Sequence, residues 1–482
     1  MLSLSLLVIV VDTTIVNVAV PTLAAQLHAG ASALEWIVDA YTLAFAALLL
    51  PAGFLGDRYG RHRALGAGLA IFGAASLGAA LSSTATELTV WRAVMGVGAA
   101  LVSPATMAVL TGVFTNPAER AKAIGIWSAV SGLGVAIGPT VGGWLLGHYS
   151  WGSIFAVNLP IVAIALIGGG LLVPASRAPR RPRFDLPGTL SAVAAFGVLT
   201  YTVIDAGNAG WTSAATLIRA GLGVALLAGF IAWESHSDHP MIDLTIFRNP
   251  RFTAASGAIM IQFFGLAGMT FVLTQIYQFV LGYSPLDAGV RSLPSALALT
   301  VAAPLGTRLA ARFGIRVAVT GGLVVAAAGL GLFALATGDS TYPHYVLAAT
   351  ITAAGIGLTM SPATTSIMDS LPPAKTGIGS AINNTTRNLG TVLGVAVVGS
   401  IAATSYTSHL TGSAAIPAAG SSIGAAAQIV RHLGASPAGH ALHTLTAQAF
   451  VHGATLGVLL AAAAALITAA ATARYLPARD TK

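Results

Sequence analysis

The stretch GFLGDRYGRHR, residues 53–63, separates two apolar runs at about 34–54 and 64–83. Each run is long enough to cross a membrane, because about 20 apolar residues span a hydrocarbon core of roughly 30 Å. A second stretch, TRLAARFGI at 307–315, lies in the equivalent place between two later runs. Aligned on Gly60 and Gly314, the two stretches share a leucine and an arginine, whereas Asp57 becomes an alanine. An internal repeat of this kind is typical of membrane folds built from two pseudo-symmetric bundles.

The composition is that of an integral membrane protein. The 482 residues are 55% hydrophobic and only 8% charged, whereas a soluble domain carries about 25% charged residues. The first apolar run lacks the basic segment of a signal peptide, so we interpret it as a retained helix. The sequence predicts an all-α fold with fourteen transmembrane helices, at about 4–25, 34–54, 64–83, 88–114, 121–147, 152–173, 187–206, 212–233, 252–280, 286–309, 315–337, 343–369, 376–405 and 445–473.

Two polar segments divide these spans. ASRAPRRPRFD (175–185) follows the sixth span, and ESHSDHPMIDLTIFRNPRF (234–252) follows the eighth. They predict three parts: an N-terminal six-helix bundle at 1–174, a linker with two additional transmembrane helices at 175–251, and a C-terminal six-helix bundle at 252–482. Within the last part, about 406–444 is rich in Ala, Gly and Ser. We expect a long extracytoplasmic loop there, either flexible or partly helical around 422–433.

The basic charge is explained by membrane orientation. Of the 23 Lys and Arg, against 15 Asp and Glu, most fall in the loops after even-numbered spans and in the C-terminal tail. Cytoplasmic loops carry such an excess, so both termini are predicted to be cytoplasmic. Abundant Ala and Gly, with Arg preferred over Lys, suggest a GC-rich bacterial genome, and we expect the protein in the bacterial inner membrane. Little basic surface remains for a nucleic acid, and we expect no nucleic-acid partner.

Missing residues exclude several kinds of site. There is no cysteine, and the only Lys followed by Ser or Thr, Lys375, is preceded by alanine, so no Walker A loop exists. No HExxH motif and no nucleophile with a base at credible spacing is present, so we expect no enzyme. His440 and His443 have no nearby acid or cysteine and favour a solvated loop over a metal site. We predict no metal, no cofactor and transport driven by a proton gradient.

The stretch at 53–63 resembles the cytoplasmic loop motif of the major facilitator superfamily, with His62 where the family often has Lys. Its glycines permit a tight turn, and its acid can pair with a cation or a helix N-terminus of the opposing half. The resemblance implies a major facilitator fold, two six-helix bundles with two extra central helices. It also implies a conformational latch, for which a merely basic loop is the alternative. The latch residues are Gly53, Asp57, Arg58, Gly60 and Arg61.

GLGVAIGPTVGGWL, residues 132–145, resembles the antiporter motif of the same superfamily. Gly134, Gly138 and Gly142 form a stripe without side chains along which a neighbouring helix can approach. Pro139 permits a kink, and Gly143 completes the motif. The resemblance implies exchange rather than symport, and generic packing of small residues is the alternative.

DTTIVNVAVP (12–21) resembles the first helix of the fourteen-helix drug:proton antiporter family. An aspartate in lipid costs roughly 2.5–3.5 kcal/mol on insertion scales, so Asp12 is expected to face the protein interior. Asp12 shares a polar face with Thr13 and Asn17, from the helical period.

EWIVDAYTLAFAALLLPAG (35–53) resembles the second helix of that family. Members that export organic cations carry an acid at the place of Asp39, so the resemblance implies cationic cargo. The alternative for Asp39 is an interfacial acid of no consequence. Glu35, nearer the water, is interpreted as an interfacial acid of no consequence.

LTVWRAVMGVGAA, residues 88–100, resembles the helix-four motif whose arginine is linked to proton transfer. Arg92 lies near the outer end of this span. It could snorkel to the interface, or it could favour ionisation of a nearby carboxylate.

Further polar residues fall within predicted spans. We interpret Asp287 and Arg291 as a local ion pair at a helix start. Arg387 could bind cargo or a carboxylate, or it could join helices. The candidates for a substrate cavity are Asn17, Tyr41, Asn158, Gln275, Asn384 and Arg387.

The sequence thus predicts a proton-coupled antiporter, expected to be a monomer, that exports hydrophobic and often cationic drugs by alternating access. Asp12, Asp39 and Arg92 are the expected coupling residues. A buried carboxyl favours its protonated form and a bound cation favours the ionised form, so proton and cargo would compete for one group. The alternative is a dedicated exporter of an endogenous antibiotic or metabolite; a channel or a membrane-embedded enzyme is disfavoured.

Overall fold

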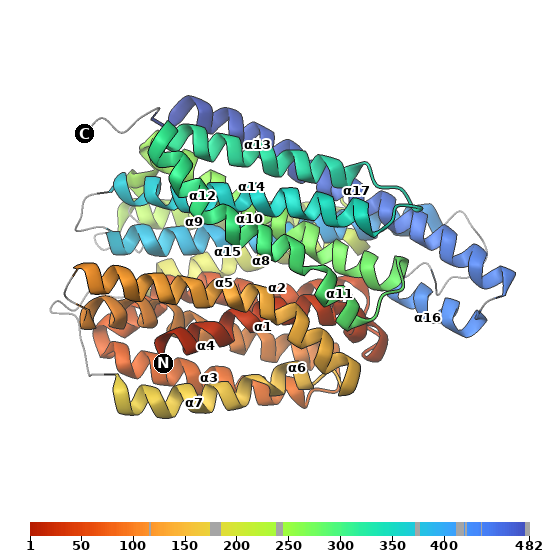
Figure 1. Cartoon of the computed structure of the whole chain (residues 1–482), viewed down its shortest axis with the longest axis horizontal. Coiled ribbons are helices and arrows are strands. Elements are labelled where there is room, and N and C mark those ends of the chain that lie inside the picture. Colours follow the sequence, from red (N-terminus) through yellow and green to blue (C-terminus); the bar gives the residue numbers. More distant parts are fainter. Residues whose placement is uncertain are drawn as a thin grey trace.

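The computed structural model describes residues 1–114, 117–173, 185–237, 244–371, 376–410, 419, 422–434 and 436–477. These residues form helices and no strand (Figure 1). The first nine helices are α1 Leu2–Gln26, α2 Ala31–Tyr59, α3 Arg61–Ala80, α4 Ala85–Val113, α5 Pro117–His148, α6 Ser153–Ala156, α7 Asn158–Leu172, α8 Leu186–Ala209 and α9 Ala214–His236.

The rest of the chain begins with the 3₁₀ turn η1, Leu244–Arg248. It continues with α10 Pro250–Gln275, the π-helical turn η2 Ile276–Val280, α11 Pro285–Arg291, α12 Leu293–Phe313, α13 Ile315–Ala334, α14 Tyr342–Asp369, α15 Thr376–Leu410, α16 Ile423–Leu433 and α17 Pro437–Tyr475.

The expected spans are present as helices. Thirteen segments of the described chain are long and apolar enough to cross a membrane, and α5 occupies the remaining span predicted at 121–147. The predicted loop at 406–444 is too long at both ends, because α15 runs to Leu410 and α17 starts at Pro437. Its partly helical form is confirmed by α16, whose first turn is capped by the Ser422 hydroxyl, which accepts a hydrogen bond from the Ala425 backbone amide.

The helices pack in two groups that lie side by side (Figure 1). The helices α1–α7 form the lower group in this view, and α10, α12–α15 and α17 the upper one, while α11 and α16 lie at the right, at the height of the lower group. Contacts between the groups run from α2 to α15, from α5 to α11 and from α1 to α10. Helix α8 contacts both α2 and α15, and α9 packs on α8.

The molecule is apolar on the outside and partly polar within. On α7, Ile167 is 66% exposed and Leu171 is 80% exposed, as expected for side chains that face lipid. In contrast, several charged side chains within the predicted spans are buried between helices: Asp12, Glu35, Asp39 and Arg92. Such residues in a membrane interior indicate functional or coupling positions.

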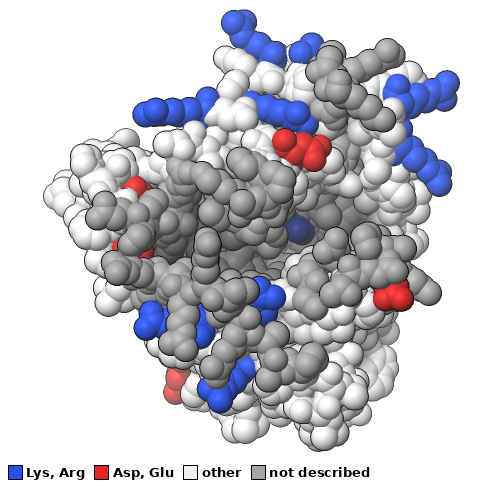
Figure 2. Space-filling model, turned by 90° about the vertical axis from the view of Figure 1, so that its left-hand side faces the viewer, with Lys and Arg blue, Asp and Glu red and all other residues white. Residues whose placement is uncertain are grey.

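One end of the molecule is basic and hollow. Figure 2 shows the end that carries the C-terminus, where Lys and Arg surround a hollow that has a further basic side chain within it. The turns at Gly60 and Gly314 connect helices at this end. Both glycines have positive φ angles, 113° and 93°, which favour glycine because a Cβ would clash with the backbone. The internal repeat therefore appears in the backbone as two equivalent single-residue turns.

Candidate functional site

A buried ion pair joins the first and fourth helices. The Arg92 Nη1 atom on α4 donates a hydrogen bond to Asp12 Oδ2 on α1 at 2.6 Å. The other oxygen, Asp12 Oδ1, accepts a hydrogen bond from Asn158 Nδ2 at 3.0 Å, and the same amide group lies 3.4 Å from the Ser76 hydroxyl. Asp12 and Asn158 are fully buried and Arg92 is 1% exposed. Both carboxylate oxygens of Asp12 thus have partners.

Helix α2 supports the arginine of this pair. Arg92 Nε donates to the Ile37 carbonyl oxygen at 3.1 Å, and its guanidinium lies 4.3 Å from the Tyr41 ring centroid. Gly96, one turn along α4, lets the two helices approach, because a Cβ there would meet the Tyr41 carbonyl oxygen and Ala44. The snorkelling alternative for Arg92 is wrong, since its side chain points inward. Its expected contact with a carboxylate is confirmed.

Asp39 on α2 stands in contrast to Asp12. It is fully buried, and neither of its carboxylate oxygens has a hydrogen-bond partner. No cation pairs with it among the residues that the structure describes. An ionised carboxylate left alone in an apolar interior costs several kcal/mol, on the order of the effective penalty for one buried ion. Asp39 is therefore suited to bind either a proton or a cation.

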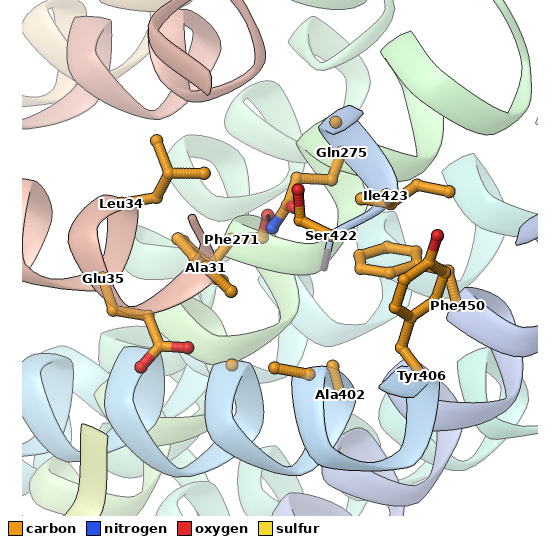
Figure 3. A pocket seen from close by; sticks show the side chains of 13 residues that line it. Ala31, Leu34, Glu35, Phe271, Gln275, Ala402, Tyr406, Ser422, Ile423 and Phe450 are labelled. Carbon is orange, nitrogen blue, oxygen red and sulfur yellow. Dashed lines mark hydrogen bonds between the residues drawn. The ribbon is translucent and has the colours of Figure 1, made fainter. Parts of the chain in front are cut away.

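Glu35 lies one helical turn before Asp39, and the expectation that it is an acid near the water is wrong. It is 1% exposed rather than interfacial, and its Oε2 atom has no partner. Figure 3 shows its carboxylate extending from α2 toward α15, at the edge of a cavity. The spacing of Glu35 and Asp39, four residues on one apolar helix, was a signal in the sequence that both could face inward.

The predicted cavity residues do not gather at one place. Asn158 is committed to Asp12, Tyr41 lies under Arg92, and Gln275 lines the cavity beside Glu35. Asn17 is half-buried and its amide donates to the Thr13 carbonyl oxygen at 3.3 Å.

The remaining two candidates lie on α15. Arg387 is half-buried, with its guanidinium 4.5 Å from the Phe263 ring centroid. No described side chain forms an ion pair with it. Asn384 is half-buried one turn before, and its carbonyl oxygen accepts from Asn388 Nδ2 at 2.9 Å.

The predicted latch residues are the end of α2 and the turn that follows. Gly53 is half-buried, Arg58 is exposed over the Tyr59 ring, and Gly60 forms the turn. Arg61 Nη1 donates to the Ala108 carbonyl oxygen on α4 at 2.9 Å. The Asp57 side chain lies outside the described residues.

The glycine stripe of α5 packs against α1, as its spacing predicts. A Cβ on Gly134 would lie 2.9 Å from Val10 Cγ1, one on Gly142 would lie 2.5 Å from Ile15 Cγ1, and one on Gly138 would overlap the Thr14 hydroxyl. Gly143 instead faces the other half, where a Cβ would lie 2.5 Å from the Pro285 carbonyl oxygen. Pro139 approaches that half too, because its carbonyl oxygen lies against Gly289 of α11. This motif therefore contacts both groups of helices.

The predicted pair of Asp287 and Arg291 is present in the structure. The Arg291 Nη1 atom donates to Asp287 Oδ1 at 2.8 Å, four residues apart at the start of α11, which confirms the local ion pair. Within the described ranges, no group of three or more His, Cys, Asp or Glu could hold a metal ion.

Comparisons with known proteins agree with this arrangement. The Multidrug efflux pump LfrA of Mycolicibacterium smegmatis is 34% identical over 97% of this chain and 94% of its own length. The Methyl viologen resistance protein SmvA of Salmonella typhimurium is 32% identical over 88% of this chain and 87% of its own length.

The fold has solved counterparts. The crystal structure of a bacterial homologue of the human lysosomal transporter Spinster superposes with a TM-score of 0.67 at 18% identity, covering 99% of this chain and 97% of that one. The sequence profile of the Major Facilitator Superfamily matches residues 2–395. The chain belongs to the major facilitator superfamily.

Proposed function

We propose that this protein is a proton-coupled antiporter that exports hydrophobic cationic drugs across the bacterial inner membrane. The observation that carries the proposal is Asp39, a fully buried carboxylate whose two oxygens have no partner. A proton neutralises this group in one state of the transport cycle and a cationic cargo neutralises it in the other. Since both ligands need the same oxygens, binding of one releases the other.

The Asp12–Arg92 pair has a different role in this proposal. Its charges already neutralise each other, and Asn158 fills the other carboxylate oxygen. The pair fixes α1 and α4 and holds the side of α2 opposite the exchange site, through Ile37 and Tyr41. We assign it to positioning and Asp39 to exchange.

The relatives support the kind of cargo. LfrA is named a multidrug efflux pump and SmvA a methyl viologen resistance protein. Methyl viologen is a dication without acidic protons, so a pump that removes it must neutralise positive charge by its own groups. A carboxylate without a partner is a suitable group for this. A dedicated exporter of one endogenous product remains the second candidate, and a narrow profile over a panel of dyes and drugs would favour it.

The arrangement of the chain supports alternating access. We propose that the bundles at 1–174 and 252–482 rock against each other. The two helices of 175–251 would lie between the surrounding lipid and the interface of the two bundles. The segment Gly53–Arg61 would act as a latch at the cytoplasmic end. The excess of Lys and Arg at the hollow end (Figure 2) favours a cytoplasmic location for it and for both termini. Cargo would enter through this hollow, and the protein would work as a monomer driven by the proton gradient, without a cofactor.

The proposal is tested by ethidium efflux from energised cells that express the wild-type protein. Efflux is expected and should stop when a protonophore collapses the gradient. A panel that adds methyl viologen, a neutral lipophilic dye and an anionic dye measures selectivity, and the cations should be preferred. Efflux that persists with the protonophore, or equal export of the anionic dye, would contradict the proposal.

A further inference from the structure

Glu35 borders a small cavity between the two halves of the molecule (Figure 3). The cavity lies at the end of the molecule away from the C-terminus, where α2 begins and α10 ends. Phe271 and Gln275 come from α10, Tyr406 from α15 and Phe450 from α17. Ser422 and the first two residues of α16, Ile423 and Gly424, complete its lining.

The size of the cavity decides what it can hold. Its volume is about 30 Å³, and one water molecule needs roughly 10–15 Å³ of such space. The cavity has room for about two water molecules, so in this conformation it is too small to hold a dye or a drug. Water in the cavity would meet the Glu35 carboxylate, whose Oε2 atom has no partner. The Gln275 amide already donates to the Phe271 carbonyl oxygen and the Ser422 hydroxyl already accepts from the Ala425 amide, but each keeps a further N–H or O–H that water could accept.

Glu35 connects this cavity to the exchange site. Glu35 and Asp39 are four residues apart on α2, so their side chains lie on one face of the helix, with Cβ atoms about 5–6 Å apart. Both are buried, and three of their four carboxylate oxygens are buried without a partner: Glu35 Oε2, Asp39 Oδ1 and Asp39 Oδ2. Among the residues that the structure describes, no basic side chain lines the cavity.

Other titratable groups near the cavity are few. Helix α15 contributes Tyr406, whose hydroxyl is already used to donate to the Ala419 carbonyl oxygen at 2.9 Å. Helices α10 and α17 and residues 422–424 contribute no charged or titratable side chain to its lining. Glu35 is thus the acid between this cavity and Asp39.

The segment formed by Ser422 and α16, which lines one side of this cavity, contacts both halves of the molecule. Gln428 Nε2 donates to the Ala25 carbonyl oxygen at the end of α1 at 3.0 Å. A Cβ on Gly424 would lie 3.1 Å from Ala24 on α1 and 3.4 Å from Phe279 on η2. Helix α16 also packs on α17. A movement of one half against the other would therefore shift this segment and alter the lining of the cavity.

We propose that Glu35 is the entry carboxyl for protons from the extracytoplasmic side. A proton passes from hydrated solvent to the Glu35 carboxylate and then, directly or through one water molecule, from the Glu35 carboxylic acid to the Asp39 carboxylate, which leaves Glu35 ionised again. Only one proton moves, and no other bond changes. This inference rests on the proposed proton coupling at Asp39.

Two assays on purified protein in liposomes separate this role from cargo binding. The first measures transport of tetraphenylphosphonium driven by an imposed pH gradient. The second measures exchange of labelled for unlabelled tetraphenylphosphonium at equal pH, which needs no net proton transfer. For Glu35→Gln, gradient-driven transport should fall about a hundredfold, a typical size for removal of one proton-transfer group. Exchange should stay within about twofold of the wild type, which also shows that the variant is folded.

A second variant keeps the acid but crowds it. Gly399→Ala adds a methyl group 2.7 Å from Glu35 Oε1, so gradient-driven transport should fall while exchange persists. Glu35→Asp should restore part of the gradient-driven rate. Glu87→Gln, an exposed acid at the start of α4 at the same end, is the matched control and should behave as the wild type.

The outcomes distinguish the two proposals. Wild-type gradient-driven transport in Glu35→Gln would overturn the entry role. Equal loss of gradient-driven transport and exchange, with Gly399→Ala unaffected in both, would overturn it too and leave Glu35 a structural residue. If wild-type protein exchanges tetraphenylphosphonium but does not respond to a pH gradient, the proposed proton coupling itself fails.

Discussion

Asp12 and Asp39 are two buried aspartates on neighbouring helices, and their surroundings differ in every respect but burial. Asp12 has an arginine at 2.6 Å and an amide at 3.0 Å, whereas Asp39 has no partner for either oxygen. A buried ion pair with all its hydrogen bonds made restrains the helices that it joins, and removal of one member strongly destabilises the protein. A carboxylate without partners can change its ligand. In the proposed assignment, the hydrogen-bond partners of each carboxylate, more than its depth in the membrane, distinguish the positioning group from the exchanging group.

The largest effect is expected from Asp39→Asn. An amide cannot carry the negative charge that neutralises a cationic cargo, so export of methyl viologen and ethidium should be lost while the protein stays folded. Efflux from energised cells and melting of the purified protein measure the two properties. Asp287→Asn removes one negative charge from an exposed ion pair and should leave efflux unchanged. Full efflux by Asp39→Asn would remove the distinction between the two aspartates.

The next effect concerns stability. Arg92→Met leaves Asp12 buried without its cation and should destabilise the protein by about 3–5 kcal/mol. Adding Asp12→Asn removes the lone charge, so the double variant should recover most of the loss. Thermal melting in detergent compares the three proteins. A single variant that melts with the wild type would show that the pair does not position α1 and α4.

A smaller effect is expected at the contact between α5 and α1. Gly138→Ala places a methyl group on the Thr14 hydroxyl and should cost about 1–3 kcal/mol, as overpacking does. Gly147→Ala on the same helix meets nothing within 4 Å and serves as the control. The melting temperatures of the two variants are compared. Equal melting temperatures would mean that α5 and α1 accommodate the extra methyl group without loss of stability.

The smallest effect tests the repeated turns. Gly60→Ala forces a side chain into a backbone with φ of 113°, which costs about 1–2 kcal/mol. Gly66→Ala lies in α3 with open space around it and should be neutral or slightly stabilising. If Gly60→Ala melts no lower than Gly66→Ala, the turn does not need glycine.

Much of the fold could be predicted from hydropathy, because each span must satisfy its own backbone within lipid. The glycine turns at Gly60 and Gly314 and the Asp287–Arg291 pair were also predictable, since they depend on neighbours in the sequence. The three-part division of the chain stays a prediction that these observations do not test.

The partners of the buried charges could not be predicted in the same way. Arg92 and Asp12 are 80 residues apart in the chain, and hydropathy says nothing about which helices touch. Its place near the start of a span predicts an interfacial Glu35, but α15 packs along α2 and Glu35 is buried beside a cavity that residues 422–424 also line. The sequence indicates how far a residue lies from the end of its own helix, but it does not indicate which other helices pack over that residue.

The most direct test is proton release on cargo binding. Tetraphenylphosphonium is added to purified protein in weakly buffered detergent solution, and a pH indicator counts the protons released per cation bound. The wild type and the Asp12→Asn/Arg92→Met variant should release about one proton per cation, as expected when one group exchanges ligands, and Asp39→Asn should release none. Undiminished release by Asp39→Asn would contradict the assignment of Asp39 as the exchanging group.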